Sequence, residues 1–246
     1  MKFAVVSLMP EMFAAIQDFG VTRRAFEREL VTLTVINPRT FAQDRHGTVD
    51  DRPYGGGPGM VLKAEPMLAA VNAAKAQLGG TPPVVHFSPR GKPLDQALLT
   101  EWVASYSAMI FLASRYEGLD ERVIESVVDL EVSVGDFVVS GGELPAMMAL
   151  DALIRLLPGA LGDESSKNDE SFIDGLLEYP QYTRPETVDG RAVPEVLLSG
   201  DHQAIAQWRH QQSLMVTKLR RPDLLKRRGV SDQEARFLET ASKKPE

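Results

Sequence analysis

The 246-residue chain contains no cysteine and only four histidines. Without cysteine there are no disulfides and no thiolate metal sites, and a reducing cytoplasm is permitted. The four histidines are scattered along the chain and form no group with metal-ligand spacing. We therefore predict no resident metal, while a transient magnesium ion stays an open alternative.

The chain also lacks a long apolar run. No segment approaches the roughly 20 apolar residues that a membrane-spanning helix needs. The apolar stretch Phe3–Met9 is short and is followed by Pro10-Glu11, so we interpret it as a first buried strand and not as a signal peptide. Hydrophobic residues make up 43% and charged residues 25% of the chain, which is typical of globular proteins. We expect a cytoplasmic protein that is not bound to a membrane.

Two common nucleotide-binding signatures are absent. The chain has no G-x-x-x-x-G-K-[ST] loop, and Ser7-Leu-Met-Pro-Glu follows the first predicted strand where a dinucleotide site would have G-x-G-x-x-G. A Walker-type phosphate site is therefore excluded, and a nicotinamide-dependent enzyme is disfavoured.

The charge is acidic overall but basic in one place. The net charge is −7, which argues against nonspecific coating of nucleic acid. The segment from Trp208 to Arg228, however, contains seven basic residues and only one acidic residue, Asp223. Such a block suits contact with a polyphosphate, and a solvated helix face is the alternative.

The first two-thirds of the chain alternates strand-like and helix-like patterns, which favours a mostly parallel sheet covered on both faces. Helical spacing is found in Glu65–Leu78, Leu94–Ser105 and Leu119–Val128, and Ser140–Pro145 leads into an apolar helix, Ala146–Leu157, which we expect to be buried in the core or against a second subunit. Short runs rich in Val, Ile and Phe predict strands at Phe3–Ser7, Leu30–Ile36, Val84–Phe87, Met109–Ala113 and Val132–Val139.

The composition changes at Gly162. Residues 163–171 include no apolar side chain and predict a mobile linker. Beyond them, helices are expected at Asp201–Leu219 and Ser231–Ala241. We predict a catalytic α/β domain over residues 1–161, a flexible linker over 162–174 and a helical C-terminal domain over 175–246.

Several glycine-bearing loops follow the predicted strands, where open α/β sheets bind ligands. They are Ser88–Gly91, Ser114–Gly118 and Ser140–Gly142. A further cluster, Gly55–Gly59, has four glycines in five positions, which let a backbone approach a ligand closely; a flexible surface loop is the alternative.

Five blocks of this sequence, in the same order, resemble the bacterial tRNA (guanine-N1)-methyltransferases of the TrmD family. The similarity extends from Ser7-Leu-Met-Pro-Glu-Met-Phe13 to Arg228. The blocks are Asp50-Asp-Arg-Pro-Tyr-Gly-Gly-Gly-Pro-Gly-Met60, Arg115-Tyr-Glu-Gly-Leu-Asp-Glu-Arg122, Gly135-Asp-Phe-Val-Val-Ser-Gly-Gly-Glu-Leu-Pro-Ala146, Gly175-Leu-Leu-Glu-Tyr-Pro-Gln-Tyr-Thr-Arg-Pro-Glu186 and Trp208-Arg with Gln212-Ser-Leu and Leu219-Arg-Arg-Pro222.

The resemblance implies a fold and a reaction that periodicity does not. It implies the SPOUT fold, an α/β domain with a deep trefoil knot at the cofactor site, in a homodimer with active sites at the subunit interface. The implied reaction moves a methyl group from S-adenosylmethionine (AdoMet) to N1 of the guanosine 3′ of the anticodon, position 37, in tRNA. A noncatalytic RNA-binding protein, or a SPOUT methyltransferase acting on another RNA atom, is the alternative.

By position in the matching blocks, the AdoMet pocket falls on three strand-end loops. Ser114 stands where the family commonly has glycine, so a left-handed backbone there would be strained. The implied pocket residues are His86, Phe87, Ser88, Pro89, Arg90, Ser114, Tyr116, Glu117, Val134, Gly135, Asp136, Phe137, Val138, Val139, Gly141, Gly142 and Pro145.

The resemblance also implies catalytic residues. Guanine N1 needs a base to remove its proton, and a guanidinium would stabilise the charge that develops on O6. Arg155 matches the family's arginine, although a salt-bridged cation at a helix end is the plain alternative. The family's aspartate precedes Ser-Phe, which places Glu170 at the base position, with Asp169 as the alternative one residue earlier.

Contacts with tRNA are expected beside the glycine loop and in the C-terminal part. Phosphate contacts fix position, while base contacts specify. The linker is expected to order on tRNA, with a passive tether as the alternative. The candidate tRNA contacts are Arg45, His46, Arg52, Tyr182, Arg184, Arg209, Lys218, Arg220 and Arg221.

Overall fold

The computed structural model describes residues 1–161 and 170–241. The chain forms two compact units, Met1–Gly162 and Asp163–Glu246. The predicted mobile linker lies largely outside the described residues. The catalytic and tRNA-binding roles assigned to the two parts stay predictions.

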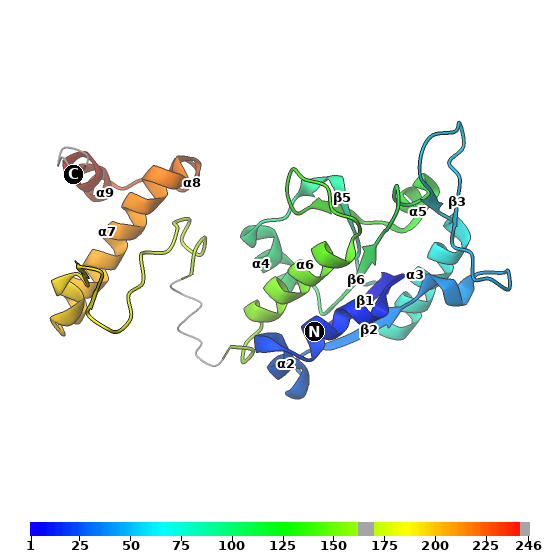
Figure 1. Ribbon diagram of the computed structural model, residues 1–246, viewed down its shortest axis with the longest axis horizontal. Coiled ribbons are helices and arrows are strands. Elements are labelled where there is room, and N and C mark those ends of the chain that lie inside the picture. Colours follow the sequence, from blue (N-terminus) through cyan, green and yellow to red (C-terminus); the bar gives the residue numbers. More distant parts are fainter. Residues whose placement is uncertain (162–169, 242–246) are drawn as a thin grey trace. The chain divides into compact units, whose positions relative to one another are not determined.

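The first unit contains a parallel five-stranded sheet with the order β2-β1-β6-β5-β7 (Figure 1). Outside this sheet, β3 and β4 form a short antiparallel hairpin in the first unit, and β8 and β9 form another in the C-terminal unit. The strands are β1 (Lys2–Ser7), β2 (Thr32–Ile36), β3 (Asp50–Asp51), β4 (Val61–Leu62), β5 (Val84–Pro93), β6 (Ala108–Ala113), β7 (Leu130–Ser133), β8 (Thr187–Val188) and β9 (Arg191–Ala192).

Helices cover both faces of the sheet, as the alternating pattern predicts. The helices of this unit are α1 (Ala14–Gln17), α2 (Gly20–Glu27), α3 (Ala64–Leu78), α4 (Gln96–Ser105), α5 (Glu121–Val127) and α6 (Glu143–Leu156), with 3-10 helices at Pro10–Phe13 and Pro38–Phe41.

Successive residues of a strand point to opposite faces, and the core follows this period of two. In β6, Phe111 packs in one cluster with Trp102 of α4 and Leu150 of α6, while the next residue, Leu112, packs with Val71 of α3 in the other. The sheet is therefore buried on both faces, and its carboxyl edge presents the irregular part of β5 and the loops after β6 and β7.

Two strand predictions are wrong in extent. β7 ends at Ser133 and does not continue to Val139, because Ser133 Oγ both accepts from Gly135 N and donates to Gly135 O, and Gly135 has a φ of 146°. β5 continues past Phe87 to Pro93, with a register shift against β7 between Phe87 and Lys92. Residues 134–139 are consequently a loop at the carboxyl edge.

Helix α6 begins at Glu143 and includes Pro145 in its first turn, where a missing N–H costs no helical hydrogen bond. One face is buried, including Leu150, Leu153 and Ile154. On the opposite face, Leu144 is 48% and Met148 54% exposed. Within one chain, α6 is therefore buried on one face, and its opposite face is exposed.

The C-terminal unit is helical around a small core of Leu176, Leu214, Leu225 and Leu238. Glu234 joins its helices, because its carboxylate accepts hydrogen bonds from Arg228 and from the backbone N–H of Ser231, and this holds the pKa of Glu234 at about 2. The helices are α7 (His202–Arg220), α8 (Pro222–Arg228) and α9 (Asp232–Ala241), with a 3-10 helix at Glu195–Leu198.

Candidate functional site

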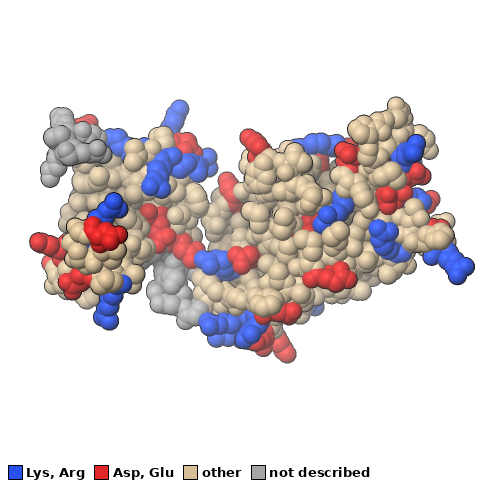
Figure 2. Space-filling view, in the orientation of Figure 1, with Lys and Arg blue, Asp and Glu red and all other residues tan. Residues whose placement is uncertain are grey.

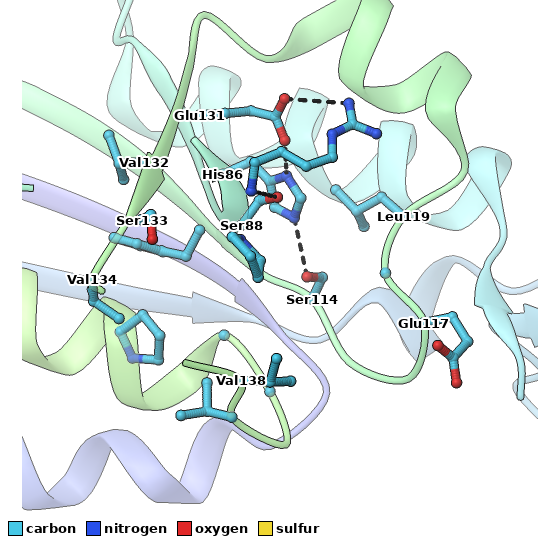
Figure 3. Close-up of a pocket in the computed structure, with 18 of the residues that line it drawn as sticks. His86, Ser88, Ser114, Glu117, Leu119, Glu131, Val132, Ser133, Val134 and Val138 are labelled. Carbon is cyan, nitrogen blue, oxygen red and sulfur yellow. Dashed lines mark hydrogen bonds and ion pairs between the residues drawn. The ribbon is translucent and has the colours of Figure 1, made fainter. Parts of the chain in front are cut away.

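A cleft lies at the carboxyl edge of the sheet, between the irregular part of β5 at its register shift and the loops that follow β6 and β7 (Figure 3). Apart from the exposed Asp136, every residue predicted for the AdoMet pocket lines it. These lining residues are His86, Phe87, Ser88, Pro89, Arg90, Ser114, Tyr116, Glu117, Val134, Gly135, Phe137, Val138, Val139, Gly141, Gly142 and Pro145.

Close backbone contacts fix the walls of the cleft. A Cβ on Gly91 would lie 2.3 Å from Val132 N, and a Cβ on Gly142 would lie 2.7 Å from Ala113 Cα. Gly142 N donates to Ser114 O at 2.7 Å. Glycine at both positions therefore permits a packing that no other residue allows without a shift.

Ser114 fits this arrangement without strain. Its backbone lies outside the left-handed region, whereas Tyr116, two residues later, has a φ of 60°. The side chain of Ser114 is half-buried at the cleft wall. The strain that a serine at this position would cause in a left-handed backbone does not arise.

A chain of hydrogen-bonded polar side chains forms part of the cleft wall. His86 is 4% exposed, with Nδ1 3.1 Å from Glu131 Oε1 and Nε2 3.0 Å from Ser114 Oγ. Arg90 donates to Glu121 through two nitrogens and contacts Glu131 at 3.4 Å. Burial lowers the pKa of His86, and the neighbouring Glu131 partly opposes this.

The loop before α6 is held by a buried ion pair. Arg115 Nε lies 3.0 Å from Glu143 Oε2, and Ser7 Oγ donates to Glu143 Oε1 at 2.9 Å. Glu143 is fully buried. The ends of β1 and β6 and the start of α6 are thereby joined beside the cleft.

The glycine-rich loop connects β3 and β4 and is bonded to the loop that contains Glu117. Glu117 N donates to Met60 O, and Leu62 N donates to Gly118 O, each at 2.9 Å. A Cβ on Gly59 would meet Glu117 Oε1 at 2.2 Å. Tyr54, near the tip of the hairpin, is 99% exposed.

Of the catalytic candidates, Arg155 belongs to the same unit as this cleft but does not line it. Arg155 lies in the last turn of α6, whereas Pro145 of its first turn lines the cleft. Glu170 is half-buried in the C-terminal unit, where it lines a hollow together with Arg209 and His210. Asp169 lies outside the described residues.

The tRNA-contact candidates are on the surfaces of both units. Arg45, His46 and Arg52 are exposed near the glycine-rich hairpin. In the C-terminal unit Tyr182 lies 6.3 Å from the ring of Trp208, and Arg209 lies over Tyr179 at 4.8 Å, so aromatic and cationic groups adjoin one another.

Three more basic candidates lie at the end of α7 and at the residue between α7 and α8. Lys218, Arg220 and Arg221 are exposed, although Lys218 donates to Leu238 O and Arg221 pairs with Asp223. Figure 2 shows Lys and Arg side chains gathered over α8. Arg184 is exposed as well.

Several cleft residues were missed by sequence reasoning. Glu131 contacts His86 because the parallel register of β5 and β7 places them opposite each other, and no local sequence signal gives that register. Glu121 is part of the block from Arg115 to Arg122. The additional lining residues are Gly118, Leu119, Glu121, Ile124, Glu131, Val132 and Ser133.

The side chains that line the cleft indicate which ligand groups it can hold. Phe137 and Val138 are exposed apolar side chains beside glycine backbone, which suits an adenine ring, and Glu117 offers a carboxylate to a cationic group.

Within residues 1–161 and 170–241, no group of three or more His, Cys, Asp or Glu could hold a metal ion. In the same residues, no helix is long and apolar enough to cross a membrane.

The model of the family described as tRNA (Guanine-1)-methyltransferase TrmD matches residues 1–227. The chain belongs to this family. It is 55% identical over 235 residues to the tRNA (guanine-N(1)-)-methyltransferase of Coxiella burnetii (strain RSA 493 / Nine Mile phase I), covering 96% of this chain and 95% of the relative.

Two further relatives have the same name. The protein of Idiomarina loihiensis is 52% identical over 238 residues, covering 97% of this chain and 94% of the relative. That of Shewanella putrefaciens is 53% identical over 238 residues, covering 97% and 96%. The predicted TrmD family is thus confirmed over nearly the whole chain.

Proposed function

We propose that the chain is a tRNA methyltransferase that transfers the methyl group of AdoMet to N1 of the guanosine at position 37. The supporting observation is the cleft, where the residues implied for AdoMet by family position converge from three separate loops. Membership of the TrmD family supports the choice of guanine N1 in tRNA. Both alternatives, a noncatalytic RNA-binding protein and a methyltransferase for another RNA atom, are disfavoured by that membership.

The chain folds, in this proposal, as a SPOUT domain with a trefoil knot at the cleft. The contacts between residues 113–115 and 141–142 support this, because Gly142 packs on the backbone of Ala113 and Ser114 while Arg115 and Gly141 form a β-bridge. Two chain segments that are distant in sequence cross there without room for a side chain.

In the proposed reaction the guanine N1 proton moves to a carboxylate as N1 attacks the methyl carbon, and the carbon–sulfur bond of AdoMet breaks. Glu170 is the base, with Asp169 as the alternative. Arg155 stabilises the charge that grows on O6. Glu117, which lines the cleft, would offer a favourable negative charge to the sulfonium.

The active site is proposed to be shared between the subunits of a homodimer. Arg155 follows Pro145 by ten residues on α6, so the two lie roughly 15 Å apart along the helix axis. This separation supports an Arg155 that is supplied to each cleft by the second chain. The exposed apolar side chains Leu144 and Met148 on the same helix supply a surface for the second copy.

Binding of tRNA is assigned to the basic and aromatic surfaces of the C-terminal unit and to Arg45, His46 and Arg52. A cytoplasmic location follows from this substrate. The linker around Glu170 is proposed to order when tRNA binds and to bring the base to the guanine. The proposal includes no resident metal. Methyl transfer is measured with and without magnesium, because a transient magnesium ion stays an open alternative.

The function is tested by two measurements on the intact protein. Calorimetry with AdoMet examines the cleft, and transfer of a labelled methyl group to unmodified tRNA examines the reaction. Binding with transfer is expected. Absence of transfer to tRNA would instead support the noncatalytic alternative, and label on a ribose would support a methyltransferase for another atom.

The base is tested by Glu170→Ala and Asp169→Ala, assayed separately with AdoMet binding confirmed. We expect the variant that lacks the base to lose more than tenfold in transfer rate, since general bases contribute roughly 10²–10⁴-fold. Glu239→Ala, on the exposed surface of α9, is the control for loss of a carboxylate. If neither linker variant loses tenfold, a carboxylate base in this segment is wrong.

A further inference from the structure

We propose that Ser114 is a specificity-determining residue for the methyl donor, and that His86 is a positioning residue that makes the Ser114 hydroxyl a hydrogen-bond acceptor toward the cleft. The inference rests on the proposed function, since it concerns how the cleft distinguishes AdoMet. It assigns a task to a buried histidine that the proposed reaction does not use.

The three side chains form one continuous hydrogen-bonded chain (Figure 3). It runs from Glu131 Oε1 to His86 Nδ1 at 3.1 Å and from His86 Nε2 to Ser114 Oγ at 3.0 Å. His86 is almost fully buried, while Ser114 is half-buried and lines the cleft. A ligand can therefore reach the serine but not most of the imidazole.

The partner at one end fixes the direction of every hydrogen bond. An ionised carboxylate only accepts, so Nδ1 of His86 has the proton that it donates to Glu131. In the neutral ring Nε2 is then an acceptor, and the Ser114 hydroxyl must donate to it. The lone pairs of Ser114 Oγ remain for the cleft, and they select a ligand group that donates, such as an amine or hydroxyl.

The charged groups around His86 support the neutral ring. Glu131 of β7 contacts Nδ1, while Arg90, at the register shift of β5, and Glu121 of α5 lie further along the same network. Burial lowers the pKa of His86 despite the two carboxylates. The ring is consequently neutral at neutral pH and gains a proton only in acid.

Protonation would reverse the hydrogen bond to Ser114. Nε2–H of the imidazolium becomes a donor, Ser114 Oγ accepts from it, and the serine hydroxyl turns its proton toward the cleft. A ligand group that donates then meets another donor. Affinity for the methyl donor should thus fall as the pH is lowered through the depressed pKa of His86.

The test is calorimetry of AdoMet binding between pH 8 and pH 5, with folding of each variant checked by circular dichroism. Wild-type affinity should weaken toward acid. Ser114→Ala should bind about fivefold more weakly at pH 8, equivalent to roughly 1 kcal/mol, with a flatter pH profile. Ser114→Thr, which keeps the hydroxyl, should restore most of the affinity.

His86→Phe keeps a ring in the buried space and should flatten the pH profile, whereas His202→Phe at an exposed position should not. A purely structural role of His86 would lower stability without changing that profile. Wild-type affinity in Ser114→Ala, or an unchanged acid loss in His86→Phe, would overturn the inference. Failure of the wild-type protein to bind AdoMet at all would instead overturn the proposed function on which it rests.

Discussion

Glu143 is a fully buried carboxylate whose oxygens accept from Ser7 and from Arg115. Glu143 has a structural role, because these contacts join the end of β1 and the loop after β6 to the start of α6. A buried ion pair adds little over a well-packed apolar pair, but removal of one partner leaves the other charge uncompensated.

Glu143→Ala should therefore lower the free energy of unfolding by roughly 3–5 kcal/mol. Urea unfolding followed by circular dichroism measures this change. Glu27→Ala is the matched control, since Glu27 pairs with Arg23 on the surface of α2 with both side chains more than half exposed, and such pairs contribute about 0.3–0.5 kcal/mol. Equal losses in the two variants would show that the buried pair has no special role.

At the scale of elements, the glycine-rich hairpin and the loop that contains Glu117 behave as one unit, because backbone hydrogen bonds join Met60 to Glu117 and Leu62 to Gly118. Gly59 permits this approach. Gly56 has a φ of 77°, against 80° for Gly59, but a Cβ added to Gly56 would meet no atom within 4 Å. The two glycines thus differ in contact but not in backbone conformation.

We expect Gly59→Ala to weaken AdoMet binding and methyl transfer severalfold more than Gly56→Ala. Both substitutions strain a left-handed backbone by roughly 1–2 kcal/mol, and only the first also displaces the Glu117 carboxylate. Calorimetry and initial transfer rates for the two variants measure the difference. Indistinguishable variants would mean that the contact between the hairpin and Glu117 is irrelevant to the site.

The elements also show where sequence reasoning succeeds and fails. The continuous apolar runs of β1 and β6 identify buried strands, because successive side chains meet helices on opposite faces of the sheet. The end of β7 at Ser133 was not predicted, since it depends on local bonds between Ser133 and the backbone of Gly135. Helix α8 was not predicted, because it is short and its only buried residues, Leu224 and Leu225, are adjacent and followed by basic residues, so no helical spacing of apolar residues is visible.

The loops that form the cleft were predictable from their place after the strands, but the ligand and the individual site residues were predictable only through family position. Short loops such as Ser88–Gly91 have no pattern that specifies a ligand. The contact of His86 with Glu131 needs the register between strands 45 residues apart. Charge periodicity likewise does not locate Arg155, whose proposed role requires a second chain.

At the scale of the whole molecule, an acidic protein must bind an acidic polymer through local basic surfaces. If about four of the proposed Arg and Lys contacts meet phosphates, tRNA affinity should fall roughly 50- to 150-fold between 50 and 200 mM salt. Fluorescence anisotropy of labelled tRNA measures the slope, which Arg220→Ala should reduce by about one.

Arg23→Ala is the control, because Arg23 is an exposed cation of α2 that has no proposed tRNA contact. It should leave the salt slope unchanged. An affinity that hardly changes with salt in the wild-type protein would refute the basic-surface assignment.

The central claim is a methyl transfer to guanine N1 beside the anticodon, and one measurement tests it most directly. Two tRNA transcripts that differ only in guanosine or adenosine at position 37 are incubated with the protein and labelled AdoMet. The products are digested to nucleosides and identified by mass spectrometry. The account predicts 1-methylguanosine from the first transcript and no methylated nucleoside from the second. A methyl group on another atom, or equal labelling of both transcripts, would contradict it.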